Sequence, residues 1–257
     1  MKYIDTHVHL YSDDFDEDRN AVIKRAMAAG IDKFVLPNVD SHTLQPMLDL
    51  VNEYPQACFP LLGLHPCSVK QDFEQELTIV EERLPSGQYK GVGEIGLDYY
   101  WDITYKEQQL EALKIQISLA KQYSLPVVLH SRDSFGDLIE VIEEYSEGGQ
   151  LSGVFHCFTG TIEDAKRIKA LGNFYIGIGG VVTFKNGGLD KVLPELKLED
   201  IVLETDAPYL APSPYRGKRN ESAYLALIAS KVAEYMGKSL EEVAAVTTQN
   251  AKNLFSL

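Results

Sequence analysis

The feature that most constrains this fold is a repeated alternation of short apolar stretches with longer amphipathic ones. The short stretches are rich in β-branched residues, as in strands buried on both faces, and the longer ones have helical spacing. The predicted strands are residues 3–10, 33–38, 58–64, 89–94, 126–130, 153–156, 174–178 and 201–206. The predicted helices are residues 16–29, 41–52, 73–83, 105–123, 137–145, 162–171, 189–195 and 222–236, followed by two short helices.

This order of elements predicts an α/β fold in which helices cover a parallel sheet. Eight strand–helix units in 257 residues fit a closed (β/α)8 TIM barrel better than a doubly wound sheet, because such barrels have about 250 residues. A hydrophobic fraction of 45% is sufficient for a large core. No polar linker divides the chain, so we expect a single domain over residues 1–257.

Candidate metal ligands stand at the predicted carboxyl ends of the strands, where barrels of this type carry their active sites. His7 and His9 alternate with Val8 in the first strand, so their side chains share one face, and Asp5 is predicted to lie deeper on it. Each residue alone could be structural, but their coincidence at one rim favours a metal site. The candidate ligands are His7, His9, Glu94, His130, His156 and Asp206.

Six nitrogen and carboxylate ligands exceed the three protein ligands usual for one catalytic zinc ion. Two divalent cations that share one ligand would use all six. Glu94 is predicted to be the shared ligand, because a carboxylate has two oxygens and this residue ends the predicted fourth strand. Asp206 is predicted to bind metal and to accept the proton of the attacking water. Glu94 and Asp206 are therefore the predicted catalytic residues.

Composition excludes several function classes. The formal charge of −14 argues against broad nonspecific binding to a polyanion, which needs a basic face. The three cysteines lack Cys-x-x-Cys spacing, and this favours reduced thiols in the cytoplasm. We see no signal peptide and no apolar run of membrane-spanning length, and no obligate protein partner is evident.

A basic cluster on this acidic chain predicts contacts with phosphate. Arg216, Lys218 and Arg219 follow the eighth strand, near where barrels frequently bind phosphate, although such a run can also be a solvated surface. His65 ends the third strand and is expected to contact substrate or to support a ligand. Close after Glu94 come three aromatic residues, Tyr99, Tyr100 and Trp101. Their rings could stack on a base of the substrate or pack on neighbouring helices, and the sequence does not decide between these two roles.

Several motifs together resemble the TatD family of metal-dependent deoxyribonucleases. The motifs are Asp5-Thr6-His7-Val8-His9, Gly63-Leu64-His65-Pro66, Gly93-Glu94-Ile95-Gly96-Leu97-Asp98-Tyr99, His130-Ser131-Arg132, His156-Cys157-Phe158-Thr159-Gly160, Glu204-Thr205-Asp206-Ala207-Pro208 and Arg216-Gly217-Lys218-Arg219-Asn220-Glu221. The resemblance covers essentially the whole chain. One departure is Ser222, where the family pattern leads us to expect proline.

The resemblance implies a barrel with two divalent cations. It assigns the first ion to His7, His9, Glu94 and Asp206, and the second to Glu94, His130 and His156. Zinc, manganese and iron suit these ligands better than magnesium does, and the identity of the metal stays open. Arg132, in the His130 motif, becomes a candidate for binding substrate. Related amidohydrolases often carry a carboxylated lysine at strand four, so Glu94 favours the TatD branch.

The resulting hypothesis is a metal-dependent phosphodiesterase that removes nucleotides from DNA ends or oligonucleotides, by resemblance from the 3′ end. One alternative is the same scaffold hydrolysing a small ester, lactone or amide, and the basic cluster argues against it. The other is a metal-binding interaction protein without turnover, and the complete set of ligand positions argues against that.

Overall fold

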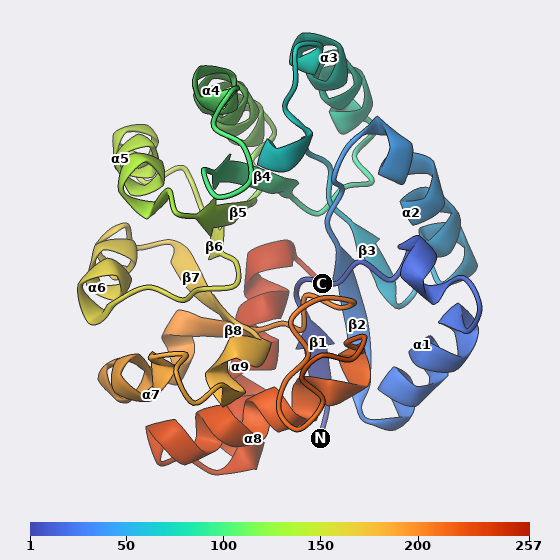
Figure 1. Ribbon diagram of the computed structural model, residues 1–257, viewed down its shortest axis with the longest axis vertical. Helices are drawn as coiled ribbons and strands as arrows, with labels where there is room; N and C mark the ends of the chain where they lie inside the picture. Colours follow the sequence, from blue (N-terminus) through green and yellow to red (C-terminus); the bar gives the residue numbers. More distant parts are fainter.

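Eight parallel strands form a ring that eight helices surround in the computed structural model, which describes residues 1–257 (Figure 1). The strands are β1 (Tyr3–Asp5), β2 (Ile31–Leu36), β3 (Cys58–Pro60), β4 (Val92–Asp98), β5 (Val127–Arg132), β6 (Gly153–Phe155), β7 (Phe174–Ile178) and β8 (Ile201–Leu203). The strand order follows the chain, in one run from β1 to β3 and another from β4 to β8.

Two sets of backbone contacts join these runs into a closed barrel. Between β3 and β4, Leu62 pairs with Val92 in a parallel bridge. Between β8 and β1, the amide of Thr6 donates to the carbonyl oxygen of Leu203 at 3.1 Å, and the amide of Asp206 donates to that of His7 at 2.9 Å. The predicted (β/α)8 TIM barrel is therefore confirmed.

The helices agree with the sequence periodicity in all but their ends. They are α1 (Arg19–Ala28), α2 (Ser41–Glu53), α3 (Phe73–Arg83), α4 (Lys106–Tyr123), α5 (Phe135–Ser146), α6 (Ile162–Ala170), α7 (Leu189–Val192), α8 (Leu225–Met236) and α9 (Leu240–Phe255). Capping boxes at Asp40, Thr161 and Ser239 start α2, α6 and α9, because each side chain accepts an amide hydrogen bond that the first turn leaves free. The prediction of two short C-terminal helices is wrong, since α9 is continuous. None of the helices is both long enough and apolar enough to span a membrane.

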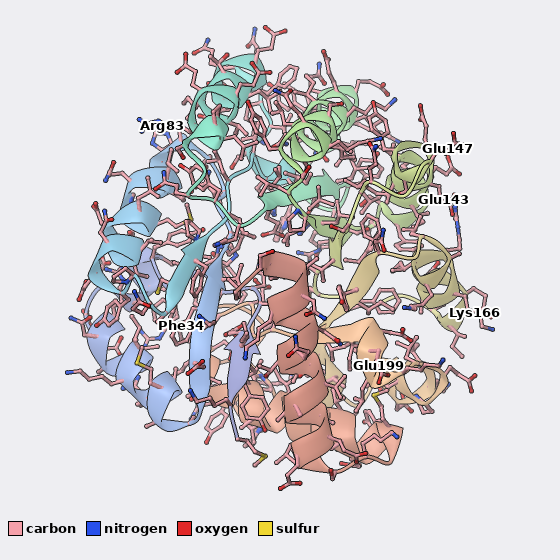
Figure 2. All side chains as sticks on the ribbon, turned by 180° about the vertical axis from the view of Figure 1, so that it is seen from behind. Phe34, Arg83, Glu143, Glu147, Lys166 and Glu199 are labelled. Atoms are coloured by element: carbon pink, nitrogen blue, oxygen red, sulfur yellow. The ribbon has the colours of Figure 1, made fainter.

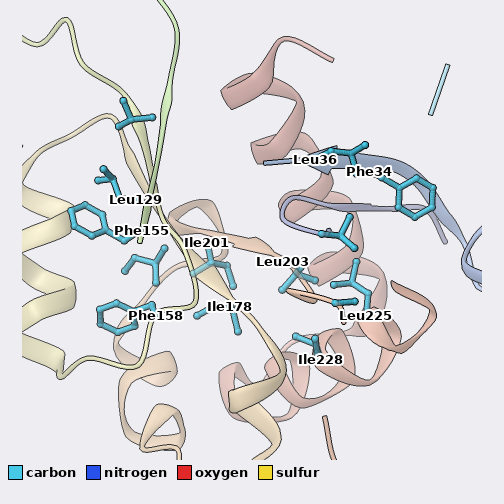
Figure 3. Packing of buried hydrophobic residues seen from close by; sticks show 14 of the residues in the cluster. Phe34, Leu36, Leu129, Phe155, Phe158, Ile178, Ile201, Leu203, Leu225 and Ile228 are labelled. Atoms are coloured by element: carbon cyan, nitrogen blue, oxygen red, sulfur yellow. The ribbon is translucent and has the colours of Figure 1, made fainter. Parts of the chain in front are cut away.

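Two apolar layers hold the barrel together. The larger lies between strands and helices, where Leu203 of β8 packs near Leu225 and Ile228 of α8 (Figure 3). The smaller fills the barrel interior and includes Ile4, Val35, Leu61, Val128, Val154 and Val202, together with Ala251, Leu254 and Phe255 of α9. Seen from behind, α9 crosses the middle of the ring (Figure 2). It therefore closes the amino-terminal end of the barrel and leaves the opposite mouth for polar groups.

Several predicted strand ends are wrong, and those of β1, β4 and β8 change the position of candidate ligands. β1 ends at Asp5 and β8 at Leu203, so His7, His9 and Asp206 lie in the segments that follow these strands. β4 continues to Asp98, so Glu94 lies within the strand and not at its end. A Cβ at Gly96 would collide with the backbone of His130. Glycine here permits the close approach of β4 to β5.

Candidate metal centre

His7, His9 and Asp206 converge on one carboxylate oxygen of Glu94 at the barrel mouth. Glu94 Oε2 lies 3.1 Å from His7 Nε2 and 3.8 Å from His9 Nε2. Asp206 Oδ1 lies 3.8 Å from His7 Nε2 and 3.6 Å from His9 Nε2. The structure thus brings together the four residues that the resemblance assigned to the first ion.

The other oxygen of Glu94 faces three further histidines. Glu94 Oε1 lies 2.8 Å from His130 Nδ1, 3.4 Å from His65 Nε2 and 3.6 Å from His156 Nε2. A single buried carboxylate therefore presents one oxygen to each of two histidine groups. This is the arrangement that a ligand shared by two cations requires.

The second histidine group differs from the predicted set for the second ion. Ligand atoms of His65, Glu94 and His130 lie within 4.8 Å of one another, as do those of His7, His156 and Asp206, and those of His7, His9 and Glu94. The ring of His156 stacks on His7 with centroids 3.5 Å apart, whereas its centroid is 6.3 Å from that of His130. His65, which we expected to contact substrate or to support a ligand, lies among the candidate ligands.

Unpaired nitrogen atoms in this cluster favour a bound cation. The side chain of His7 is fully buried, and neither of its ring nitrogens has a hydrogen-bond partner. Leaving a buried polar group unpaired costs about 1–3 kcal/mol. A metal ion would accept the free lone pair of the ring, so the residues present fit a metal centre.

The carboxylates at this site stay ionised despite their burial. Burial alone would raise the pKa of Glu94, but electrostatic interaction with the surrounding histidines, His7 first, holds it well below its usual value. Burial also opposes ionisation of Asp206, but the surrounding imidazoles of His9, His156 and His7 lower its pKa. Two negative charges surrounded by imidazole nitrogens are suited to divalent cations.

Asp5 does not join this cluster, so the prediction that it lies deeper on the histidine face is wrong. Its carboxylate accepts hydrogen bonds from the amide and hydroxyl of Thr205 at 2.9 and 2.6 Å, and from the hydroxyl of Ser222 at 2.6 Å. Strand alternation does not persist from Asp5 to His7, because β1 ends between them.

Comparison with known proteins decides the family. A family model described as "TatD related DNase" matches residues 4–256. The chain belongs to the TatD family. This confirms the resemblance inferred from the motifs and makes the chain a member of a family of metal-dependent hydrolases.

Individual TatD relatives are similar over almost their full length. The "Uncharacterized metal-dependent hydrolase YabD" of Bacillus subtilis is 38% identical over 255 residues, with 98% of each chain covered. A protein of Escherichia fergusonii named "3'-5' ssDNA/RNA exonuclease TatD" is 34% identical, also with 98% of each chain covered. The crystal structure of the TatD homolog YjjV from Escherichia coli has a TM-score of 0.90 at 32% identity, covering 99% of this chain and 98% of that one.

Tyr11 orients His9 in this TatD barrel, a role that sequence reasoning missed. The Tyr11 hydroxyl donates to the carbonyl oxygen of Pro37 at 2.5 Å and lies 2.8 Å from His9 Nδ1. Because the Tyr11 hydroxyl donates its only hydrogen to Pro37, it must accept a hydrogen bond from the N–H of His9 Nδ1. The lone pair of His9 is then on Nε2, the atom that faces Glu94 and Asp206.

Asp98 contacts His130 on the side opposite Glu94. Asp98 Oδ2 lies 2.9 Å from His130 Nε2, and Glu94 Oε1 lies 2.8 Å from His130 Nδ1. Burial would lower the pKa of His130, but these two carboxylates raise it. A signal for Asp98 was present in the sequence, because alternation places it on the same face of β4 as Glu94.

Glu204 supports His156 and was also missed. Its Oε1 lies 3.0 Å from His156 Nδ1 and accepts a 2.5 Å hydrogen bond from the amide of Cys157. A Cβ at Gly177 would approach Glu204 Oε2 within 2.6 Å, so glycine in β7 makes room for this carboxylate. Gly177 therefore packs against Glu204. The position of Glu204 two residues before Asp206 was the available signal.

The predicted basic cluster divides into two parts. Arg219 is bound to the protein itself, with Nη2 2.8 Å from Asp18 Oδ2 and Nη1 2.6 Å from the carbonyl oxygen of Asp14. Arg216 and Lys218 join no ion pair; Arg216 instead has its guanidinium carbon 3.9 Å from the centroid of the Phe184 ring. Their role in binding substrate stays a prediction.

Arg132 lies beside the histidine cluster and next to a cleft. It stands two residues after His130 in β5, so the two side chains share a face. Its guanidinium carbon is 3.7 Å from the centroid of the Tyr100 ring. The cleft between the segments after β5 and β6 is lined by Ser131, Asp133, Ser134, Phe135, Phe155, His156, Cys157, Phe158, Thr159 and Gly160.

Proposed function

We propose that this TatD chain is a metal-dependent phosphodiesterase that removes nucleotides from free ends of single-stranded DNA. The observation that carries the proposal is the position of Glu94, with one oxygen toward His7 and His9 and the other toward His65, His130 and His156. The name of the Escherichia fergusonii relative, a single-stranded DNA and RNA exonuclease, supports the substrate class.

Two divalent cations are part of this proposal. His7, His9, Glu94 and Asp206 would hold the first ion, while Glu94 and His130 would hold the second together with His65, His156 or both. Such cations supply Lewis acidity, which lowers the pKa of water and neutralises charge on a phosphoryl oxygen. The histidine content favours zinc, manganese or iron over magnesium.

Asp206 is the proposed proton acceptor. Its side chain is 13% exposed, which leaves it accessible at the mouth, and its depressed pKa keeps it ionised and able to take a proton. Tyr11 keeps the lone pair of His9 on Nε2, and Glu94 offsets the repulsion between two neighbouring cations. Each of these groups acts from a buried position, where water cannot compete for it.

Substrate shape follows from the location of the site. The cluster lies at the mouth of a closed barrel, among the segments that follow the strands. A free single-stranded end can enter such a mouth more easily than a continuous duplex. We therefore propose end-directed cleavage, with the 3′ end taken from the family resemblance. A cytoplasmic location, suggested by the cysteine content, stays a prediction.

The test is metal analysis of purified protein, then reconstitution with zinc, manganese or magnesium and an assay on labelled strands. We expect two ions per chain and shortening of linear single-stranded DNA from one end. Equally fast degradation of a closed circular strand would contradict end-directed cleavage. Hydrolysis of small esters or lactones without action on oligonucleotides would favour the alternative substrate class, and metal binding without hydrolysis would favour an interaction protein.

A further inference from the structure

Two neighbouring aromatic side chains are exposed beside the histidine cluster. Tyr100 and Trp101 follow β4 and are 53% and 69% exposed, an unusual state for large aromatic groups. The preceding Tyr99 behaves differently, because its hydroxyl donates to Asp137 at 2.9 Å and its ring lies under Lys106. Of the three aromatics in this segment, Tyr99 therefore packs on neighbouring elements and the other two face solvent.

Arg132 completes a cationic aromatic surface with these two rings. Its guanidinium carbon lies 3.7 Å from the Tyr100 ring centroid and 5.1 Å from that of Trp101, and the two rings meet edge to face at 4.9 Å. Arg132 has no carboxylate partner in the structure, whereas nearby Lys106 is 2.8 Å from Asp137. We call Tyr100, Trp101 and Arg132 the stacking platform.

One carboxylate connects the stacking platform to the metal-ligand cluster. Asp98 Oδ1 accepts hydrogen bonds from the amides of Tyr100 and Trp101 at 3.0 and 3.3 Å. Asp98 Oδ2 lies 2.9 Å from His130 Nε2. The backbone that carries the aromatic pair is thus held at a set position relative to the site where a phosphodiester would be cleaved.

We propose that the stacking platform binds an unpaired nucleobase of the strand, next to the nucleotide that is released. The inference rests on the proposed nuclease function and names how that site would select single strands. Aromatic faces and guanidinium groups stack on any base, so such binding tolerates sequence. The positive charge of Arg132 complements a strand that carries phosphates. In a duplex the bases are stacked internally and do not offer their faces to this surface.

Binding of a nucleobase to the stacking platform can be followed directly by tryptophan fluorescence, because Trp101 is the only tryptophan of the chain. Metal-loaded protein is titrated with a thymidine oligonucleotide whose phosphorothioate linkages resist hydrolysis, while tryptophan fluorescence is followed. An abasic strand of the same length and linkage is the matched ligand control. We expect quenching with the thymidine strand and little with the abasic one. Equal responses to both strands, or strand binding without any change in fluorescence, would overturn the platform.

Variants test the energetic contribution of the aromatic ring. Trp101→Ala should weaken binding of a fluorescently labelled single strand by about 5- to 150-fold, measured by anisotropy, because it removes one base-stacking contact. Ile103→Ala is the matched control, since Ile103 is 67% exposed in the same segment but lies outside the platform. An affinity of Trp101→Ala equal to that of wild type would overturn the proposal.

The same measurements separate this inference from the proposed function. A wild-type protein that binds and shortens single strands, with no dependence on Trp101, would refute the platform and leave the nuclease function standing. A metal-loaded wild-type protein that neither binds nor hydrolyses any strand would refute both.

Discussion

The hydroxyl of Ser222 donates a 2.6 Å hydrogen bond to Asp5 Oδ2, which joins the segment after β8 to the end of β1 across 217 sequence positions. Thr205, the neighbour of Asp206, donates to the same carboxylate. Proline, which the family pattern suggested at position 222, has no hydroxyl and could not make this contact. The departure at Ser222 therefore has a structural role: it helps to hold the backbone beside a proposed catalytic residue.

Replacing Ser222 should lower the stability of the fold. Ser222→Ala leaves a buried carboxylate with one hydrogen bond fewer, so we expect the free energy of unfolding to fall by about 1–3 kcal/mol. Ser222→Pro suits the start of a helix but loses the same contact, and Ser222→Thr is the control that keeps a hydroxyl. Urea denaturation measures the effect, and an Ala variant as stable as wild type would show that the bond contributes nothing.

Asp5 should make stability depend on pH. Burial raises the pKa of Asp5 to about 7, although Ser222 and Thr205 donate hydrogen bonds to it. Because the pKa is higher in the folded state than in the unfolded one, the contribution of Asp5 is complete below about pH 4 and is lost as pH rises through about 7. In this window the stability of wild type relative to Asp5→Asn should fall by at most about 1.4 kcal/mol per pH unit.

The measurement for Asp5 is urea denaturation of both chelator-treated proteins from pH 4.5 to 8. The difference between the two proteins isolates Asp5 from the other titrating groups. A constant difference across this range would contradict a raised pKa.

Glu94→Gln tests whether one carboxylate is shared by two cations. The amide keeps the size of the side chain but removes the charge that both histidine groups face, so we expect loss of at least one ion per chain and near-complete loss of hydrolysis. The fold should persist because no bulk is added to the barrel. Metal analysis and circular dichroism provide the two readouts, and two retained ions with normal activity would disprove the shared ligand.

Asp206→Asn tests the proton acceptor. The change preserves shape but removes basicity, and turnover should fall by about 10²–10⁴. Metal content is measured on the same sample, so that a lost ligand is recognised as such. Turnover near that of wild type in a fully metal-loaded variant would assign proton transfer to another group.

The basic residues after β8 should have two different roles, with Arg216 and Lys218 binding the substrate strand and Arg219 stabilising the fold. Removing Arg216 and Lys218 together should weaken binding to single strands and flatten its salt dependence, by about 0.7 in the log–log slope for each lost phosphate contact. Arg219→Ala is the contrasting variant, because that guanidinium is bound to Asp18. It should lower stability by about 1 kcal/mol or less and leave the slope unchanged. A slope unchanged in the double variant would make Arg216 and Lys218 a solvated surface.

The architecture and most candidate ligands could be predicted from the sequence because both depend on local patterns. Apolar strands alternating with helices specify a parallel barrel, and the carboxyl ends of parallel strands meet at one rim whatever the side chains are. His7, His9, Glu94, His130, His156 and Asp206 therefore had to lie near one another. The same pattern could not place the strand ends, since glycine beside Glu94 is compatible with a terminus or with the close approach of β4 to β5.

Only the tertiary structure decided which candidate ligands face each oxygen of Glu94 and which neighbouring residues orient their side chains. His65 approaches Glu94 from the segment after β3, while His156 stacks on His7, and both outcomes depend on loop paths and ring orientations. Arg219 is paired with Asp18 across 201 positions, and no local pattern reports such a contact. Sequence periodicity specifies which face and which end of the barrel a residue occupies, whereas distances between side chains on different segments exist only once the chain is closed into a ring.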